Sequence, residues 1–498
     1  MPTLTVPRLK ERPNILLIMS DQHNRSYMRC AGHPYVRTPN LDRLAASGTR
    51  FTNTYCANPL CGPSRMSFLT SRSSSDIHVW NNGAFLASDV ATFVHHLAVA
   101  DYQTVLCGRM HFDGPDKRHG YERRIIGEQM WRAPSIPVEQ LIAHTADYLE
   151  LSGWGQTPWM NYDEQVTLEA ERFLRSSDAR SDRPWLLTVG TALPHDPCIC
   201  PKVLFDEYHP QSRVPPLPNG YLDTLHPATR LWRQRAGVDD VPDAIHQSAR
   251  AGYCGLVTFV DEQIGRVLDA LSETGLADRT IVIYTSDHGD MAGQQRFWWK
   301  TTFYDGSCGV PLIVSWPDRF RTGATESCVC SLMDVGPTLL ELAGAECMQQ
   351  VRGRSLTRFL TTDGDWEPGP DDPVEWPDTA FAEKVYRPGM REPARMIRRG
   401  RWKLNYYHGH DRPELFDMHD DPGERIDLGA DPRCAEMREE LIAAALADWS
   451  GQQVLNFFER WDADRAVRDR FARSTQAGDD DAPDPWAPTG HVEFHRGY

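Results

Sequence analysis

Apolar runs of strand length recur along the chain without polar alternation. They are NILLIMS (14–20), YQTVLCG (102–108), PWLLTVGTALPH (184–195), TIVIYTSDHG (280–289) and VPLIVSW (310–316). An uninterrupted apolar run of this length is typical of a strand that is covered on both faces. The pattern therefore predicts buried strands inside a sheet.

Segments with a helical pattern lie between these runs, at residues 38–48, 91–100, 164–177 and 257–275. The first has Thr38 and Pro39 where a helix should begin and Gly48 where it should stop. Buried strands that alternate with helices favour an α/β fold. We expect a mainly parallel, doubly wound sheet that is sandwiched by helices.

The pattern changes after about residue 362, where a segment rich in Pro, Asp and Gly indicates a linker or long loop. ARMIRRGRWKLNYY then predicts a β-hairpin with Gly400 at its turn, and residues 434–451 predict a helix. AGDDDAPDPWAPTG, near the end, is too polar to hold a core alone. We expect a catalytic α/β domain (1–375), a small α+β domain (376–450) and a C-terminal arm (451–498).

Composition limits the classes of function. The 498 residues are 40% hydrophobic and carry a net charge of −16, so the chain can fill a large core and nucleic-acid binding is not expected. An anionic substrate would need a local positive site. No apolar run approaches the roughly 18 residues of a membrane span, and the N-terminus has no signal-like core. These features predict a soluble, cytoplasmic protein.

The 12 cysteines are scattered, and in the cytoplasm we expect most to be reduced and buried. Two CxC pairs, Cys198/Cys200 and Cys328/Cys330, raise the alternative of a zinc site. Neither has a second pair at finger-like spacing, so the pattern does not favour zinc.

Polar residues follow several of the predicted strands directly. Asp21, His195 and the pair Asp287 and His288 should therefore meet at one edge of a parallel sheet. Asp21, Asp287 and His288 offer two carboxylates and an imidazole, and Gln22 could add a carbonyl oxygen. This set suits a hard divalent cation such as Ca²⁺, with the His shifting the preference toward Mn²⁺. On the DHGD motif alone, a helix-capping turn is an equal interpretation.

Further candidates are cationic or protic. GRMHF places Arg109 and His111 two residues apart, hence on one side of an extended chain. LPHDP contains His195, and WWKTTFYDG contains Lys300. Taken singly, residues of this kind are more often structural or solvated.

Cys61, in CANPLCGPSRMSFLTSR, precedes Pro63 at what should be the first turn of a helix. A helix N-terminus favours an anion and lowers the pKa of a thiol. A nucleophile and a buried structural cysteine are both compatible with this position.

CGPSRMSFLTSR closely resembles the sulfatase signature, in which C-x-P-S-R is followed by a short helix ending in Leu-Thr-Gly-Arg. GRMHF, LPHDP, SDHGD and KTTFYDGSCGVPLIV support the resemblance, which covers nearly the whole chain. It implies an alkaline-phosphatase-like α/β fold with a smaller C-terminal domain. It also implies a sulfuric ester hydrolase that acts on small-molecule sulfate esters.

In this family the signature cysteine, here Cys61, is oxidised to formylglycine by a separate maturation enzyme. One hydroxyl of the hydrated aldehyde attacks the sulfur of a sulfate ester, and loss of a proton from the second hydroxyl releases sulfate. The resemblance implies further roles by position. The metal ligands are residue 61, Asp21, Gln22, Asp287 and His288. Arg65 holds the nucleophile and the carboxylates, Arg109 and Lys300 bind sulfate, His111 is the base, His195 with Lys300 is the acid, and Asn82 contacts sulfate.

Three positions depart from the commonest sulfatase pattern, namely Gln22, Arg109 and His288. Gln22 and His288 resemble choline sulfatases and phosphonate monoester hydrolases, and GRMHFDGPDKRHGYE is especially similar to the choline-sulfatase version. The R-x-H pair at Arg109 and His111 favours sulfate. The predicted substrates are aryl sulfates or small alkyl sulfates such as choline sulfate, and the alternative is phosphonate monoesters or phosphodiesters.

A quaternary ammonium such as choline needs an aromatic cage, for which Trp131, Trp154 and Trp159 are candidates. In the subgroup that the chain resembles, the C-terminal arm packs near the active site of a neighbouring subunit. The segment from Trp461 onward suits such an arm, so a homodimer or homotetramer is expected.

Overall fold

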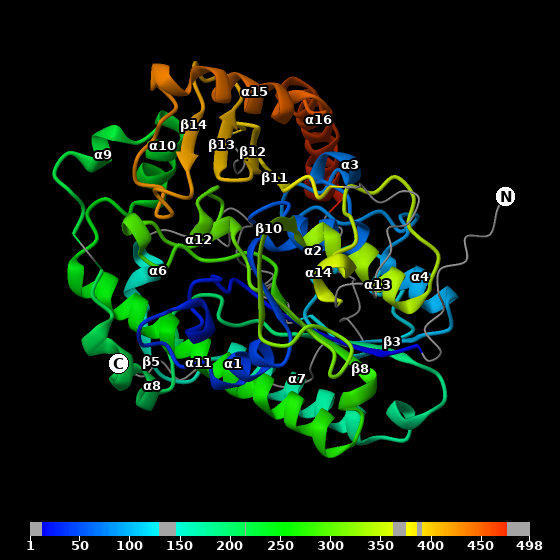
Figure 1. Cartoon of the computed structure of the whole chain (residues 1–498). Coiled ribbons are helices and arrows are strands. Elements are labelled where there is room, and N and C mark those ends of the chain that lie inside the picture. The colour runs from blue at the N-terminus through cyan, green and yellow to red at the C-terminus, as the bar shows by residue number, and fades with distance from the viewer. Residues whose placement is uncertain (1–11, 129–145, 215, 362–374, 386–390, 476–498) are drawn as a thin grey trace.

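A computed structural model describes residues 12–128, 146–214, 216–361, 375–385 and 391–475. An eight-stranded sheet lies between two layers of helices, and a smaller sheet packs beyond one of these layers (Figure 1). The strand order of the large sheet is β10-β2-β9-β8-β1-β6-β3-β4. Its strands are β1 (Asn14–Ser20), β2 (Thr49–Tyr55), β3 (Gln103–Gly108), β4 (Arg123–Ile126), β6 (Trp185–Gly190), β8 (Thr280–Ser286), β9 (Leu312–Ser315) and β10 (Ala324–Ser331).

All pairs in this sheet are parallel except those of β9, which runs antiparallel to β2 and β8. The central strand β1 lies between β6 and β8, with Ile18 opposite Val189 and Tyr284. The mainly parallel mixed sheet predicted from the sequence is therefore confirmed. The predicted strand 184–195 ends at Gly190, because the chain after it turns away to carry His195.

Successive side chains of β1 enter two different cores. Ile15, Leu17 and Met19 pack on one face, and Leu16 and Ile18 pack on the other. This is why the run NILLIMS has no polar alternation. The first core is covered by α2 (Cys61–Thr70), α4 (Phe93–Val99) and α13 (Val335–Ala343), and the second by α1 (Pro39–Ala46), α7 (Pro158–Arg175), α8 (Lys202–Tyr208) and α11 (Asp243–Glu273).

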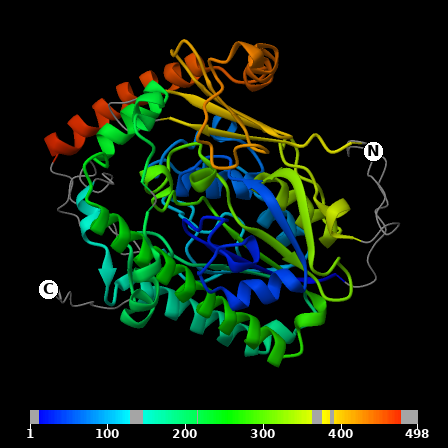
Figure 2. The same cartoon turned by 60° about the vertical axis from the view of Figure 1, so that its left-hand side comes forward.

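The long helix α11 runs along the lower layer, green in Figure 2. It begins at Asp243, well before the predicted 257, since the buried pattern continues through His246 and Ala249. Shorter elements complete the domain. They are α3 (Ser74–Ile77), α6 (Ala146–Glu150), β5 (Gly153–Trp154), β7 (Ile199–Cys200), α9 (Tyr221–Thr224), α10 (Pro227–Ala236), α12 (Asp305–Cys308) and α14 (Thr357–Leu360).

The second sheet is antiparallel, in the order β11-β12-β13-β14. Gly400, with φ +52°, makes the turn between β12 and β13, so the predicted hairpin is confirmed. Leu441 and Ala445 of the predicted C-terminal helix pack on this sheet. The elements are β11 (Thr379–Lys384), β12 (Ala394–Arg399), β13 (Trp402–Tyr407), β14 (Glu414–Asp417) and α15 (Ala435–Leu446).

The first part of the expected C-terminal arm is a helix, α16 (Gly451–Thr475). Val454 and Phe458 pack against Trp80 and Trp449, while Val467 and Phe471 near its end are exposed. Residues 476–498, with the acidic and proline-rich tail, and residues 362–374, the larger part of the predicted linker, lie outside the described residues. In the part of the chain that is described, no helix has the length and apolarity to cross a membrane.

Candidate active site

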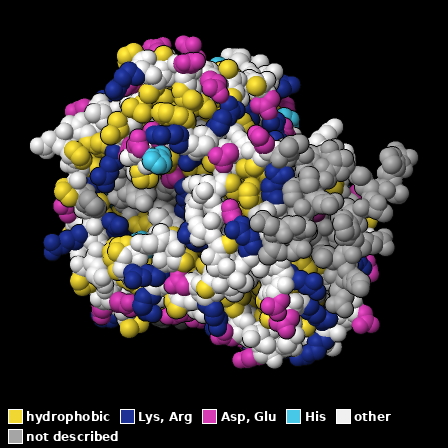
Figure 3. Space-filling model, viewed as in Figure 1, with side chains coloured by type: hydrophobic (Ala, Val, Ile, Leu, Met, Phe, Trp, Pro, Cys, Tyr) yellow, Lys and Arg dark blue, Asp and Glu magenta, His cyan; other side chains and the backbone are white. Residues whose placement is uncertain are grey.

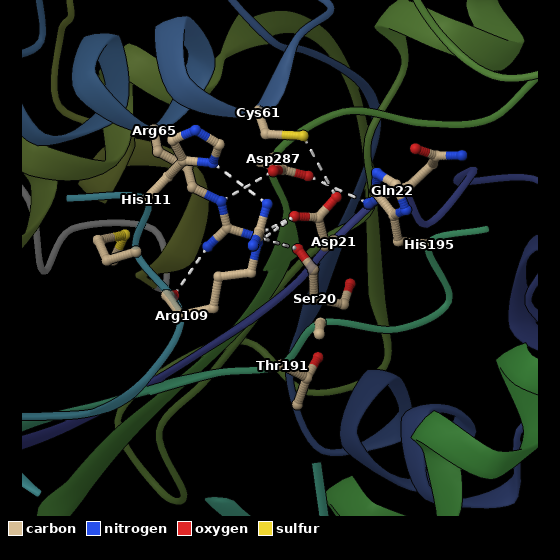
Figure 4. A network of polar contacts seen from close by, with 12 residues as sticks. Ser20, Asp21, Gln22, Cys61, Arg65, Arg109, His111, Thr191, His195 and Asp287 are labelled. Carbon is tan, nitrogen blue, oxygen red and sulfur yellow. Dashed lines mark hydrogen bonds and ion pairs between the residues drawn. The ribbon is translucent and has the colours of Figure 1, made fainter. Parts of the chain in front are cut away.

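Three parallel strands deliver the predicted polar residues to one edge of the sheet. Asp21 follows β1, His195 lies in the turn after β6, and Asp287 follows β8. Backbone hydrogen bonds join the strand ends: Asp21 N donates to Leu193 O (3.3 Å), and Asp287 N donates to Ser20 O (3.3 Å). The residues that the sequence placed at this edge therefore do meet there (Figure 4).

Cys61 is the first residue of α2, and its thiol is fully buried among these groups. Sγ lies 3.2 Å from His288 Nε2, 3.2 Å from Lys300 Nζ and 3.6 Å from Asp21 Oδ1. Burial and Asp21 raise the pKa of the thiol, but Lys300, His288 and His195 outweigh them and hold it well below its ordinary value. Any oxygen that replaced Sγ here would occupy the same strongly polarised position.

Arg65, one turn further along α2, orders the two carboxylates. Its Nε lies 2.8 Å from Asp287 Oδ2 and its Nη2 lies 3.2 Å from Asp21 Oδ2. All three side chains are completely buried. The Oδ1 atoms are left facing His288 Nε2, at 3.8 Å from Asp21 and 3.7 Å from Asp287.

The donor atoms at this point fit a divalent cation. Ligand atoms of Asp21, Cys61, Asp287 and His288 all lie within 4.8 Å of one another. His288 Nδ1 lies 3.0 Å from Gly289 O, so a proton on Nδ1 leaves the Nε2 lone pair facing the cluster. Within the described chain this is the one cluster of its kind, and neither CxC pair belongs to it. The site could hold a metal ion.

Gln22 and Lys300 form the next contact. Lys300 Nζ donates to Gln22 Oε1 (2.7 Å) and lies 2.7 Å from His195 Nε2. The amide of Gln22 is oriented by Asp196 and Asp290, whose carboxylates accept hydrogen bonds from its Nε2 at 2.9 and 2.5 Å. The carbonyl oxygen therefore points toward the cluster.

His195 is half-buried and its charge depends on several neighbours. Burial and Lys300 oppose its protonation, but Asp196, the Cys61 thiol and Asp21 raise its pKa to about 9. Because His195 Nε2 lies 2.7 Å from the Lys300 ammonium, the two groups share a proton at this contact.

The side chains of Arg109 and His111 lie together, as expected, but the backbone between them is not the extended chain that the prediction assumed. His111 has φ +64°, so the chain is not extended there. Arg109 Nη2 still lies 3.1 Å from His111 Nδ1, and its Nε donates to Asp21 Oδ2 (2.7 Å). The turn is held by Glu128, whose Oε1 accepts hydrogen bonds from the backbone N–H groups of Met110 (2.9 Å) and Phe112 (3.2 Å).

Asn82 lies beside the start of α2. Its Oδ1 accepts a hydrogen bond from Gly62 N (2.9 Å), and its carbonyl oxygen lies 3.4 Å from His111 Nε2. Asn82 thus bridges the helix that begins at Cys61 and the turn that carries His111. The eleven residues to which the sulfatase resemblance assigns roles therefore converge on one region. They are Asp21, Gln22, Cys61, Arg65, Asn82, Arg109, His111, His195, Asp287, His288 and Lys300.

Of the three tryptophans considered for an aromatic cage, Trp159 lies near the site, with its ring 6.2 Å from that of His195. Trp154 already has Lys202 Nζ 5.1 Å from its ring, and Trp131 lies outside the described residues. Three acidic residues of the site, Glu128, Asp196 and Asp290, were not expected from the sequence. Asp196 and Asp290 stand within the LPHDP and SDHGD motifs, so these motifs could have found them. Glu128 comes two residues after β4, whose sequence RRII is not an apolar run, so the signal that indicated Asp21 is missing there.

Comparison with known proteins agrees with this geometry. The sulfatase family model matches residues 13–345, and a model of the C-terminal part of N-sulphoglucosamine sulphohydrolase matches residues 293–449. The chain belongs to the sulfatase family and is a sulfuric ester hydrolase.

Individual relatives define its neighbourhood within the family. The chain is 33% identical over 444 residues to a choline-sulfatase of Rhizobium meliloti, covering 85% of this chain and 83% of that one. It is 30% identical to an arylsulfatase of Clostridium perfringens, and the match covers 70% of this chain and 78% of that one. The phosphonate monoester hydrolase of Agrobacterium radiobacter has a similar structure, with a TM-score of 0.72 and 23% sequence identity. The superposition covers 88% of this chain and 95% of that one. The fold is thus the alkaline-phosphatase-like fold of sulfatases.

Proposed function

We propose that this enzyme hydrolyses sulfate monoesters of phenols or of small alcohols such as choline, with formylglycine at residue 61 and one divalent cation, Ca²⁺ or Mn²⁺. The observation that carries the proposal is the position of Cys61 Sγ. It lies between the carboxylate and imidazole of the metal cluster on one side and the Lys300 ammonium on the other.

Asp21, Gln22, Asp287 and His288 would hold the cation, which would supply Lewis acidity beside residue 61. Formylglycine would supply a hydroxyl nucleophile whose sulfate ester can be released by carbon–oxygen cleavage. Conversion of Cys61 requires a separate formylglycine-generating enzyme, for which CGPSR is the recognition sequence.

Cationic and amide groups around residue 61 would bind the sulfate group. Arg109 and Lys300 reach this space from opposite sides, through contacts with Asp21 and with Sγ. Their charges would stabilise negative charge that develops on the sulfate oxygens. Asn82, beside Gly62, would contact a further oxygen.

Two histidines would move protons. His195 and Lys300, which share a proton across their contact, would donate it to the departing alcohol oxygen. His111 lies next to Arg109 and 3.5 Å from Asp113 Oδ2, where it would accept the proton whose loss releases sulfate.

A substrate panel tests the proposed specificity. Matured enzyme should hydrolyse an aryl sulfate or choline sulfate with a higher kcat/KM than a phenyl phosphonate monoester. The alternative, a phosphonate monoester hydrolase or phosphodiesterase, is motivated by Gln22 and His288. A preference for the phosphonate on the same sample would establish the alternative and overturn the sulfate assignment.

His111→Ala should separate the two halves of the reaction. We expect a burst of about one equivalent of alcohol, followed by turnover slowed roughly 10²–10⁴-fold, because the base for sulfate release is missing. Stopped-flow detection of the phenol from an aryl sulfate measures both phases. His96→Ala, on α4 away from the site, is the matched control. If His111→Ala turns over at the wild-type rate and shows no burst, His111 is not the base for sulfate release.

Glu128→Ala should give a weaker form of the same defect, because Glu128 holds the backbone on both sides of His111. We expect kcat to fall roughly 10–100-fold with KM little changed. Glu128→Gln keeps an oxygen acceptor and should recover much of the rate. If Glu128→Ala lowers only the melting temperature and leaves the burst amplitude and kcat at wild-type values, the positioning role is wrong.

We also propose that the chain has a catalytic domain, a small C-terminal domain and a C-terminal arm. The protein would form a homodimer or homotetramer in the cytoplasm. The second sheet and α15 fall within residues 376–450. Val467 and Phe471, exposed near the end of α16, would suit an arm that contacts another subunit. Light scattering on the purified chain should show a dimer or tetramer, and a monomer at micromolar concentration would count against this arrangement.

A further inference from the structure

A cavity of about 390 Å³ is lined by residues of the large domain together with Arg398 and a loop from the C-terminal part of the chain. Its walls come from four loop regions, at residues 24–26, 216–221, 291–295 and 418–425, together with side chains from α11, α12 and β12. Among the described residues that line it there is none of the eleven active-site residues. On the face drawn in Figure 3, a hollow lies below β14 with Lys and Arg side chains at its edges.

The charge of the cavity wall is opposite to that of the whole chain. Four arginines and two acidic residues line it, whereas the chain carries a net charge of −16. A local excess of positive charge on an acidic protein concentrates anions at that point. The charged lining residues are Arg25, Arg250, Arg398, Arg425, Asp305 and Glu424.

The two acidic residues are already paired. Asp305 accepts a hydrogen bond from Arg25, and its Oδ1 lies 2.7 Å from Lys403 Nζ. Lys403 also lies 2.7 Å from Glu424 Oε1. Lys403 is completely buried behind the wall, so Arg25 and Lys403 are the main charges that compensate these carboxylates, and Arg398 makes only a smaller electrostatic contribution at Asp305.

Arg398 is the unusual member of this set. The residue is 5% exposed, and its Nε donates to Tyr55 Oη (3.2 Å). Its Nη1 has no hydrogen-bond partner among the described residues, which also give it no ion pair with a carboxylate. A buried guanidinium nitrogen without a hydrogen-bond acceptor is costly, and the planar fork of the group matches the oxygens of phosphate and sulfate.

The cavity is large enough to hold more than a single ion. Pro216, Leu217, Tyr221, Met291 and Met418 form apolar surface beside the arginines. The volume lies within the range of small-molecule sites, roughly 300–1,000 Å³. A free tetrahedral oxyanion would fill only part of it.

We propose that this cavity is a second ligand site, distinct from the active site, which binds a tetrahedral oxyanion, either free or carried by a small organic molecule, through Arg398. Arg250 and Arg425 lie on the same wall and add positive charge, whereas the charge of Arg25 is offset by Asp305. The apolar residues would hold the organic part of the ligand where one is present.

Isothermal titration calorimetry of the full chain with inorganic phosphate, inorganic sulfate and phenyl phosphate tests this site. Arg398→Met should weaken one class of binding site at least about tenfold, the size expected for a charged hydrogen bond. The inhibition constant of phosphate against aryl sulfate hydrolysis should stay unchanged, since that constant reports the active site. Tighter binding of phenyl phosphate than of inorganic phosphate would identify an organic ligand, and equal binding would identify the free oxyanion.

Two further variants keep the test decisive. Arg425→Met, on an exposed loop position, should weaken the same class of site even if Arg398→Met folds poorly. Arg399→Met is the matched control, because successive strand residues point to opposite faces and Arg399 lies outside the cavity lining. The proposal is overturned if Arg398→Met and Arg425→Met bind all three probes with the stoichiometry and Kd of Arg399→Met.

Discussion

Cys61→Ala should lower kcat/KM for an aryl sulfate by at least about 10⁴-fold, the scale of losing a catalytic nucleophile. The thiol position is the point where Asp21, His288 and Lys300 meet, and a methyl group there leaves these residues nothing to activate. The fold should survive, because alanine fits a buried site at the start of a helix. Steady-state kinetics together with thermal unfolding of the same sample measure both effects.

Two variants sharpen this result. Cys61→Ser places an oxygen at the same position, and its sulfate ester would need water to break, so we expect at most one turnover. Cys347→Ala, at an exposed cysteine, should keep full activity. Activity of Cys61→Ala within about tenfold of wild type would show that the nucleophile lies elsewhere.

Arg65→Met should be the most destabilising single change in the site. It leaves two fully buried carboxylates, of Asp21 and Asp287, without the guanidinium that joins them. Breaking a buried ion pair in this way costs about 3–5 kcal/mol. Activity should also fall at least about 10²-fold, because the carboxylates lose their orientation toward the metal cluster. Urea unfolding in the presence of a chelator measures the stability loss.

The loss of stability in Arg65→Met should depend on pH in a direction that the pKa of Asp21 determines. Burial raises the pKa of Asp21, but Arg109, His195, Arg65 and Lys300 together hold it well below 3.8. A carboxyl with a lowered folded-state pKa stabilises the fold above its unfolded pKa and loses that contribution as pH falls. The difference between wild type and Arg65→Met should therefore be largest at neutral pH and shrink as pH falls below 3.8 toward the lowered folded-state pKa of Asp21.

Arg233→Met provides the control for Arg65→Met. Arg233 is equally buried and pairs with Asp239 at 2.7 Å, but it lies far along the chain on α10 and outside the site. It should lose stability and retain kcat. Equal losses of kcat in both variants would mean that Arg65 acts only through general stability.

The sequence predicted those parts of the molecule that local patterns specify. NILLIMS is apolar at every position because both faces of β1 are covered, and Asp21 follows it at the sheet edge. CGPSR placed Cys61 and Arg65 on one helix, one turn apart. The hairpin at Gly400 followed from a glycine between two alternating runs, and its φ of +52° shows why glycine stands there.

Other features depend on contacts between distant segments, which no local pattern contains. The reversed direction of β9 is set by its pairing with β2 and β8. The left-handed backbone at His111 is held by Glu128, which lies on a different loop. The cationic cavity at Arg398 is lined by segments between residues 24 and 425 that meet only in the folded chain.

The most direct test of the central claim is the mass of the tryptic peptide of residues 51–65, from enzyme produced with a formylglycine-generating partner. The peptide contains both Cys56 and Cys61, so fragment ions provide an internal control. We expect a loss of about 18 Da at residue 61 only, with the converted fraction tracking aryl sulfatase activity across preparations. Full activity in a preparation whose Cys61 is entirely unmodified would contradict the formylglycine mechanism.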